Sequence, residues 1–399
     1  MDDAFTFLMN MQSVTNDTPD LSICTSLRGM FAHSRFNSNI DNWDVSNITD
    51  MSLMFFQAQD FNQSLNSWDV GSVQYFNSMF NHATAFNGGI SNWNLASASN
   101  LNNLFNNATS FDQDISNWDT SNVINMQGVF AGATSFNQPL DNWDVSSVTD
   151  FSLMFAESSF NLPITSWNTQ SATNMRAMFA ASVFNQPINH FDTCQVIDMV
   201  GMFFFNDAFN QNLDNWDTSQ VTDMSMMFND ATAFNQNLNS WNVENLNQAA
   251  DMLTNSDIGI NNYTQLLQSW SQQTVNNNVT LSVGPQYCQA AQQFRDILTN
   301  TYGWIIIDGG VDTSANCTLG IEELEQSTFE LYPNPATNQV SIDCNEHAFA
   351  KAELYNLQGQ RVAYFTTSSF SVRKLKTGMY IVQVTTVDGQ RLSERFIKR

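Results

Sequence analysis

Apolar residues recur along most of the chain with one long period. A Phe-Asn pair, Phe-Asp in one case, returns every 24 or 25 residues, and a second aromatic residue follows seven positions later. Such units cannot bury an apolar face alone, so they predict a stack of nine units over residues 36–260. The opening residues are Phe36, Phe61, Phe86, Phe111, Phe136, Phe160, Phe184, Phe209 and Phe234.

Each unit divides into two halves. Met51, Met54, Phe55 and Ala58 stand at i, i+3, i+4 and i+7, which is one face of a short helix. The other half, residues 65–70, is short and holds β-forming residues, which predicts one strand that pairs in parallel with its neighbours. We therefore expect an α/β repeat solenoid of the leucine-rich-repeat kind, with one short parallel strand and one short helix in each unit of about 25 residues.

The periodic region is flanked by segments of different character. The N-terminal part looks like an imperfect repeat or cap, and the piece after the repeats alternates helix and strand patterns, as a cap would. The last part has short alternating strands separated by turn residues, which indicates a small β-sandwich. The expected divisions are a cap at 1–35, the repeats at 36–260, an αβαβ cap at 261–312, a linker at 313–325 and the sandwich at 326–399.

An asparagine follows the opening phenylalanine of every unit except one, which has Asp112. A short amide can satisfy turn backbone groups that water does not reach. We therefore expect an internal, structural ladder formed by Asn37, Asn62, Asn87, Asn137, Asn161, Asn185, Asn210 and Asn235.

The residue after each second aromatic is Asp six times and Asn three times. Either side chain can cap a turn, and a column of calcium ligands is the alternative. The three neutral asparagines and the missing Gly-Gly-x-Gly-x-Asp pattern weaken the calcium alternative. We therefore expect no cofactor, with Ca²⁺ as the one alternative. The acidic members are Asp44, Asp69, Asp119, Asp144, Asp192 and Asp217.

The second aromatic is tryptophan in every unit but one, which has Phe191. An aromatic at one position of every coil favours a core ladder between coils. Exposed rings would instead form a platform on which a sugar could stack. Both interpretations concern Trp43, Trp68, Trp93, Trp118, Trp143, Trp167, Trp216 and Trp241.

Charge narrows the classes of partner. The chain has 38 acidic and 13 basic residues, and residues 322–399 hold nine of each, which leaves 29 and 4 before them. Such a surface repels phosphate, so nucleic acid and anionic lipid are not expected partners. No stretch has the roughly 20 apolar residues of a membrane span.

Cysteine and histidine give little evidence of chemistry. Cys288 and Cys317 flank one small segment and can form a disulfide outside the cytosol, with two buried thiols as the equal alternative. The spacing of Cys and His fits no structural zinc site. No nucleophile, phosphate-binding or metal motif interrupts the repeats, so we expect no enzyme.

Two family resemblances rest on quoted segments. The repeat FNQPLDNWDVSSVTDFSLMF at 136–155 and the segment at 262–310 resemble BspA-like leucine-rich-repeat surface proteins. This resemblance implies a surface-exposed solenoid that takes part in adhesion or partner binding.

The C-terminal segments LYPNPATNQVSI, AELYNLQGQRV and LKTGMYIVQV resemble the sorting domain of the Bacteroidetes type IX secretion system. The resemblance implies export by that machinery, through residues 326–399, to the surface or exterior of a Gram-negative bacterium. Such proteins begin with a signal peptide, and none is visible after Met1, so we expect upstream sequence to be missing.

These observations predict an exported, non-catalytic binding or adhesion module for a protein or glycan. A structural spacer or surface-layer protein without a specific ligand is one alternative. A polysaccharide-active enzyme on the solenoid is another, and it would require a local break in the repeat.

Overall fold

The computed structural model describes residues 1–7, 18–314, 329–343, 348–356, 361–387 and 391–399. The chain forms two compact units, Met1–Leu319 and Gly320–Arg399, each with its own apolar core.

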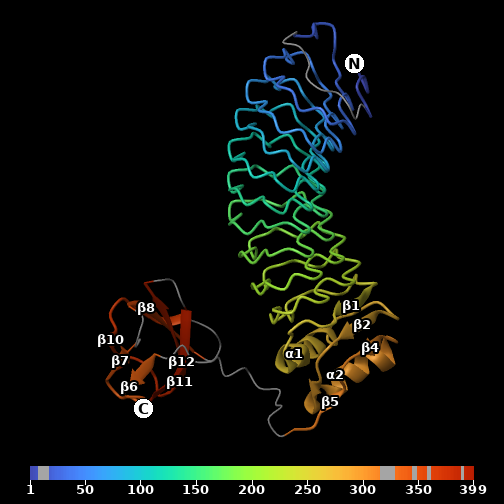
Figure 1. Cartoon of the computed structure of the whole chain (residues 1–399). Helices are drawn as coiled ribbons and strands as arrows, with labels where there is room; N and C mark the ends of the chain where they lie inside the picture. The colour runs from blue at the N-terminus through green and yellow to red at the C-terminus, as the bar shows by residue number, and fades with distance from the viewer. Residues whose placement is uncertain (8–17, 315–328, 344–347, 357–360, 388–390) are drawn as a thin grey trace. The chain divides into compact units, whose positions relative to one another are not determined.

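Successive repeats of the first unit form coils that lie one upon another (Figure 1). One residue of each coil makes a parallel β-bridge to the corresponding residue of the next coil, 24 or 25 positions later. Each coil is named here by that bridging residue. The ten bridging residues are Ser26, Asp50, Tyr75, Asn100, Asn125, Asp150, Asn174, Asp198, Asp223 and Gln248.

The predicted helix of each unit is wrong. After the bridge the chain makes consecutive tight turns, in which the amide of Met54 donates to the carbonyl of Met51 at 3.2 Å. The amide of Leu53, however, donates to the carbonyl of Asn77 in the next coil at 3.0 Å. Leu53 also has a φ of 59°, in the left-handed region. Because alternate amides leave the coil for the next one, the i to i−4 ladder of an α-helix cannot form.

The predicted strand at residues 65–70 is also wrong. This stretch turns instead, since the amide of Trp68 donates to the carbonyl of Leu65 at 3.2 Å. Coils pair through the bridging residue just before the consecutive turns. The predicted apolar face is nevertheless buried, because Met51, Met54 and Phe55 are each 0% exposed.

Stacked aromatic rings form the centre of the first unit. The rings of Phe55 and Phe80 in adjoining coils have centroids 5.4 Å apart, and those of Phe80 and Phe105 are 5.7 Å apart. Both pairs are nearly parallel, and all three side chains are fully buried. One coil therefore buries its aromatic face against the next, as the periodic sequence requires.

The last part of the first unit has conventional elements. Strands β1, β2 and β4 form one parallel sheet that continues the ladder of bridges, and β3 pairs with β5. The elements are β1 Ala249–Leu253, α1 Ile260–Trp270, β2 Thr280–Val283, β3 Tyr287–Cys288, the 3-10 turn η1 Gln289–Ala291, α2 Gln292–Asp296, the π-helical turn η2 Ile297–Thr301, β4 Ile305–Ile307 and β5 Val311–Asp312.

The second unit consists of two antiparallel sheets, with strand orders β10-β7-β6 and β12-β11-β8-β9. Val340 and Phe370 of the first sheet share one apolar core with Leu354 and Val382 of the second. The strands are β6 Glu330–Tyr332, β7 Gln339–Asp343, β8 Phe349–Tyr355, β9 Arg361–Phe365, β10 Ser369–Ser371, β11 Gly378–Thr386 and β12 Arg391–Lys398.

Candidate binding surface

The tryptophan column lies in the core. Its members are between 0% and 7% exposed. From Trp68 onward the indole N–H donates to a backbone carbonyl of the preceding coil, as from Trp143 to Ile115 at 3.0 Å. The sugar-platform interpretation of Trp43, Trp68, Trp93, Trp118, Trp143, Trp167, Trp216 and Trp241 is therefore wrong. Because the indole N–H satisfies a buried carbonyl, each ring faces inward.

Phe191 is the exception in this column, and its neighbour compensates for it. Phenylalanine has no N–H, and the carbonyl of Ile164 would lack the indole donor that its counterparts have. The Nε2 atom of His190 lies 3.1 Å from that carbonyl, so a His190 tautomer protonated at Nε2 replaces the indole. His190 therefore makes the hydrogen bond that a tryptophan makes in the other coils.

The Asp and Asn residues after the aromatic column cap turns. Oδ1 of Asp44 accepts hydrogen bonds from the amide of Ser46 at 3.1 Å and from its hydroxyl at 2.6 Å. The hydroxyl and amide bonds lower the pKa of Asp44, and the corresponding bonds from Ser121 lower the pKa of Asp119. In the part of the chain that the structure describes, no group of three or more His, Cys, Asp or Glu side chains could hold a metal ion.

Asp69, Asp144, Asp192 and Asp217 cap turns in the same way. Each carboxylate accepts a hydrogen bond from the amide two residues later, at 2.9–3.1 Å. The neutral members Asn94, Asn168 and Asn242 make the corresponding bond at 2.9–3.1 Å. Since Asn and Asp serve this turn equally, the column requires no charge.

The asparagine ladder exists, but the prediction that it is internal is wrong. Oδ1 of Asn37 accepts the amide of Asn62 at 2.9 Å, and Oδ1 of Asn62 accepts that of Asn87 at 2.8 Å. These three side chains are exposed. The preceding phenylalanine points inward, so its neighbour faces solvent. The remaining members, Asn137, Asn161, Asn185, Asn210 and Asn235, continue the same ladder.

Cys288 is disulfide-bonded, whereas Cys317, its predicted partner, lies outside the described residues. Cys24 and Cys194 are free thiols.

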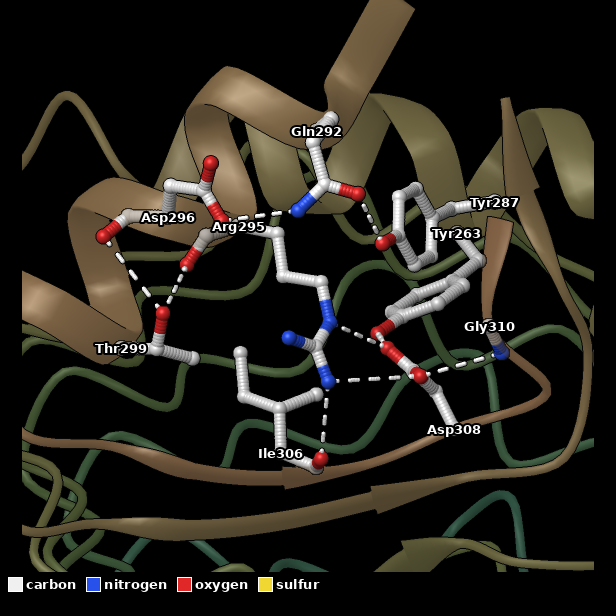
Figure 2. Close-up of polar contacts among 9 residues, drawn as sticks. All are labelled: Tyr263, Tyr287, Gln292, Arg295, Asp296, Thr299, Ile306, Asp308 and Gly310. Atoms are coloured by element: carbon white, nitrogen blue, oxygen red, sulfur yellow. Dashed lines mark hydrogen bonds and ion pairs between the residues drawn. The ribbon is translucent and has the colours of Figure 1, made fainter. Parts of the chain in front are cut away.

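A polar cluster joins the elements of the cap (Figure 2). Arg295 Nε donates to Asp308 at 2.8 Å, and the Tyr263 hydroxyl donates to the same carboxylate at 2.7 Å. Arg295 also donates to the carbonyl of Ile306 in the edge strand β4, at 3.0 Å. Burial and the bond to Asp308 raise the pKa of Tyr263, so its phenol stays protonated. The cluster therefore holds the cap together and offers no nucleophile.

Each coil has four positions outside the main apolar core, the outward positions, at two, three, six and seven residues after the bridge, although some of their side chains, such as Ser152 and Val200, are buried. The residues three and seven positions after the bridge have positive φ in every coil from Ser26 to Gln248. In the Tyr75 and Asn100 coils all four positions are polar. They hold Asn77, Ser78, Asn81, His82, Asn102, Asn103, Asn106 and Asn107.

The next five coils change this polar pattern locally. Apolar side chains replace the amides at the same positions, and Leu153, Phe205 and Met226 are 39%, 49% and 39% exposed. The following residues are called the apolar strip: Ala131, Leu153, Ala156, Ala177, Ala180, Ala181, Phe204, Phe205 and Met226.

Direct bonds between coils hold the strip together. The amide of Ala177 donates to the carbonyl of Val200 at 2.9 Å, and that of Ala181 donates to Phe204. Ala131, Ala156 and Ala180 form an apolar cluster separate from the main core, with Phe204 packed against it. Ala131, Ala156 and Ala180 are only 5–8% exposed and form the floor of the strip across successive coils, whereas Leu153, Phe205 and Met226 project from it.

Acidic residues border the strip. Glu157 and Asp230 occupy outward positions next to it, and Asp207 lies just beyond Phe205. Arg176, the only basic residue between positions 36 and 294, pairs with Asp198 at 3.4 Å. The border is therefore strongly negative, with its one cation already in an ion pair.

Sequence reasoning missed the strip, although a signal exists. Reading each unit separately shows helical spacing of the buried residues, whereas the strip emerges only when one outward position is compared across all units. In that comparison His82 and Asn107 correspond to Ala181 and Phe205.

Comparison with known families matches most of the chain. Residues 1–112, 89–183 and 158–270 match the family described as Mycoplasma protein of unknown function, DUF285. Residues 330–399 match the secretion system C-terminal sorting domain. No curated protein and no solved structure matches the chain.

The sorting domain marks a protein that is secreted or reaches the cell surface, and it implies an interaction with the type IX secretion machinery. Within the described ranges, no helix has the length and apolar character needed to cross a membrane. The family matches extend over residues 1–270, more than half of the chain, so the protein belongs to the DUF285 family and carries a secretion sorting domain near its C-terminus.

Proposed function

We propose that the protein is a non-catalytic binding or adhesion module of the cell exterior of a Gram-negative bacterium of the Bacteroidetes, built on a solenoid of the BspA-like leucine-rich-repeat kind. Its sorting domain, a small β-sandwich in this proposal, directs type IX secretion, and the stacked coils present the apolar strip to a protein or glycan. The observation that carries the proposal is the local replacement of polar by apolar residues at Leu153, Phe205 and Met226.

This replacement supports binding because folding alone does not require it. The same positions are polar in the Tyr75 and Asn100 coils, which stack with the same hydrogen bonds. Large exposed apolar patches are uncommon on monomeric proteins and mark interaction sites. The Asp50 coil also carries apolar residues, Leu53 and Phe56, at the corresponding positions, but only the coils from Asn125 to Asp223 continue such residues over five successive coils. This continuity favours a specific surface over a uniform spacer.

The test is binding of the full chain to a panel of bacterial and algal polysaccharides, exported proteins and whole cells. A double variant, Phe205→Asn with Met226→Asn, places at each site a residue that the chain already carries at the equivalent positions, Asn107 and Asn103. The control variant, Ser78→Asn with His82→Asn, changes the same positions in the polar Tyr75 coil.

Saturable binding that the strip variant weakens and the control variant retains would support the proposal. Binding to no member of the panel would favour the spacer alternative, and equal binding by all three proteins would place the interaction elsewhere. Turnover of a polysaccharide would favour the enzyme alternative.

A further inference from the structure

The spacing of the coils limits what can lie along the strip. Beneath it, the phenylalanine rings of adjoining coils, from Phe130 to Phe228, have centroids 5.4–5.8 Å apart. Hydrogen-bonded backbones in a ladder are about 4.8 Å apart. One turn of an α-helix rises 5.4 Å, which lies between the backbone spacing and the largest ring spacing. A helix parallel to the stack therefore advances by about one turn from each coil to the next.

An extended peptide fits this spacing less well. Its side chains on one face repeat every two residues, about 6.6–6.8 Å, so they fall out of step with the coils after a few repeats. Five coils span four steps of about 4.8–5.8 Å, roughly 19–23 Å, which corresponds to a helix of about 13–15 residues at 1.5 Å per residue.

The side chains of the strip suit a helix. Ala131, Ala156 and Ala180 are small and 5–8% exposed, so they form a low floor that another backbone can approach closely. Phe205 and Met226 project at one end, where they can pack against large apolar side chains. A partner with an apolar stripe at i, i+3, i+4 and i+7 matches this arrangement.

The charged residues next to the apolar strip indicate which charges its partner carries. Glu157 and Asp230 lie seven residues after the bridge in two of the five coils, and Asp207 follows Phe205 by two residues. Arg176 is paired with Asp198. An acidic partner would meet repulsion here, whereas lysine or arginine beside an apolar stripe would meet an opposite charge.

From these observations we propose that the apolar strip binds an amphipathic α-helix, about four turns long, with an apolar stripe flanked by basic residues. The inference rests on the proposed function and names the class of partner for the same surface. The helix lies along the stack and advances by one turn from each coil to the next, over the four steps from Asn125 to Asp223.

The test uses the full chain and three synthetic 16-residue peptides. The first has leucine at every third or fourth position and lysine on both flanks of that stripe. The second has the same composition in an order that breaks the stripe, and the third replaces each lysine by glutamate. Affinity is measured by fluorescence anisotropy at low and high salt, for the wild type, the strip variant Phe205→Asn/Met226→Asn and the control variant Ser78→Asn/His82→Asn.

The striped basic peptide should bind the wild type and the control variant at least tenfold more tightly than the strip variant, and more weakly at high salt. The other two peptides should bind at least tenfold more weakly. Equal affinity of the striped and scrambled peptides, equal affinity for the strip variant, or no binding of the striped peptide would overturn the inference. If a glycan from the panel binds the strip while the peptide does not, the helix inference fails and the proposed function stands.

Discussion

Asn206 is fully buried between coils of unequal length, and its removal should be costly. Its Nδ2 donates to the carbonyl of Phe184 at 3.1 Å, and its Oδ1 accepts the amides of Ala208 and Phe209, both at 3.0 Å. The repeat shortens to 24 residues twice before this coil and returns to 25 at Phe209. Asn206 therefore satisfies the backbone where the path of the chain changes.

The magnitude follows from the groups left unpaired. Asn206→Ala removes a donor from the carbonyls of Phe179 and Phe184 and the acceptor of two amides. The Phe179 carbonyl keeps the Ser182 hydroxyl, so one carbonyl and two amides lose their partner, and each buried unpaired group costs about 1–3 kcal/mol. Ala208 is only half-buried, so water can reach its amide and reduce that share. We expect the free energy of unfolding of the first unit to fall by about 3–5 kcal/mol.

Tryptophan fluorescence during urea unfolding of the full chain measures this change. All ten tryptophans precede residue 305, so the signal reports the first unit alone. The control is Asn210→Ala, an exposed ladder position whose side chain accepts the Asn235 amide, and it should cost less than about 1 kcal/mol. The reasoning is refuted if Asn206→Ala lies within 1 kcal/mol of the wild type, or if both variants cost the same.

Three further predictions use the same unfolding assay. His190→Ala should cost about 1 kcal/mol by removing the donor to the Ile164 carbonyl, and adding Phe191→Trp should restore it; no rescue would contradict the proposed replacement. Ser152→Ala should be neutral or stabilise by up to about 1 kcal/mol, because its buried hydroxyl lacks a partner within the described structure, whereas Ser52→Ala, which loses bonds to Asp50 and Arg28, should destabilise. Because the pKa of Tyr263 is raised in the folded protein, the unfolded phenol ionises first as the pH rises. The stability from this group is therefore complete below pH 10 and declines above it, by at most about 1.4 kcal/mol per pH unit. Tyr263→Phe should flatten this decline, and an unchanged slope would count against the prediction.

The buried pattern of the repeats could be predicted from sequence, whereas the backbone path could not. Met51, Met54 and Phe55 share one buried face, as their spacing indicates. An α-helix and a chain of tight turns both place i, i+3 and i+4 on one side, so spacing alone does not separate them. The amide of Leu53 decides between them by bonding the next coil, a contact 24 residues away.

The left-handed positions show a second limit of local reasoning. Leu153, Met226 and Phe205 all have positive φ, although glycine or asparagine usually marks such positions. Left-handed residues outside glycine cost about 1 kcal/mol, which the bonds between coils offset here. No Val, Ile or Thr occupies either left-handed position from Ser26 to Gln248. This absence is expected, because a side chain branched at Cβ clashes with the backbone at positive φ.

The direction of the tryptophan side chains and the position of the apolar strip could not be predicted for a related reason. Sequence shows that an aromatic residue recurs but does not show which way it points, and a buried indole needs a carbonyl partner that only the preceding coil supplies. The polar-to-apolar change at Phe205 is visible in sequence once equivalent outward positions are known, and those positions come from the structure.

Hydroxyl-radical footprinting of the full chain, with and without a bound ligand from the panel, tests the central claim most directly. Phe205 and Met226 are exposed in the strip, and Tyr75 is 45% exposed in a polar coil, so all three side chains should be oxidised in the free protein. The account predicts that ligand reduces oxidation of Phe205 and Met226 and leaves Tyr75 unchanged. Unchanged oxidation of Phe205 and Met226 at saturating ligand would contradict the assignment of the apolar strip as the binding surface.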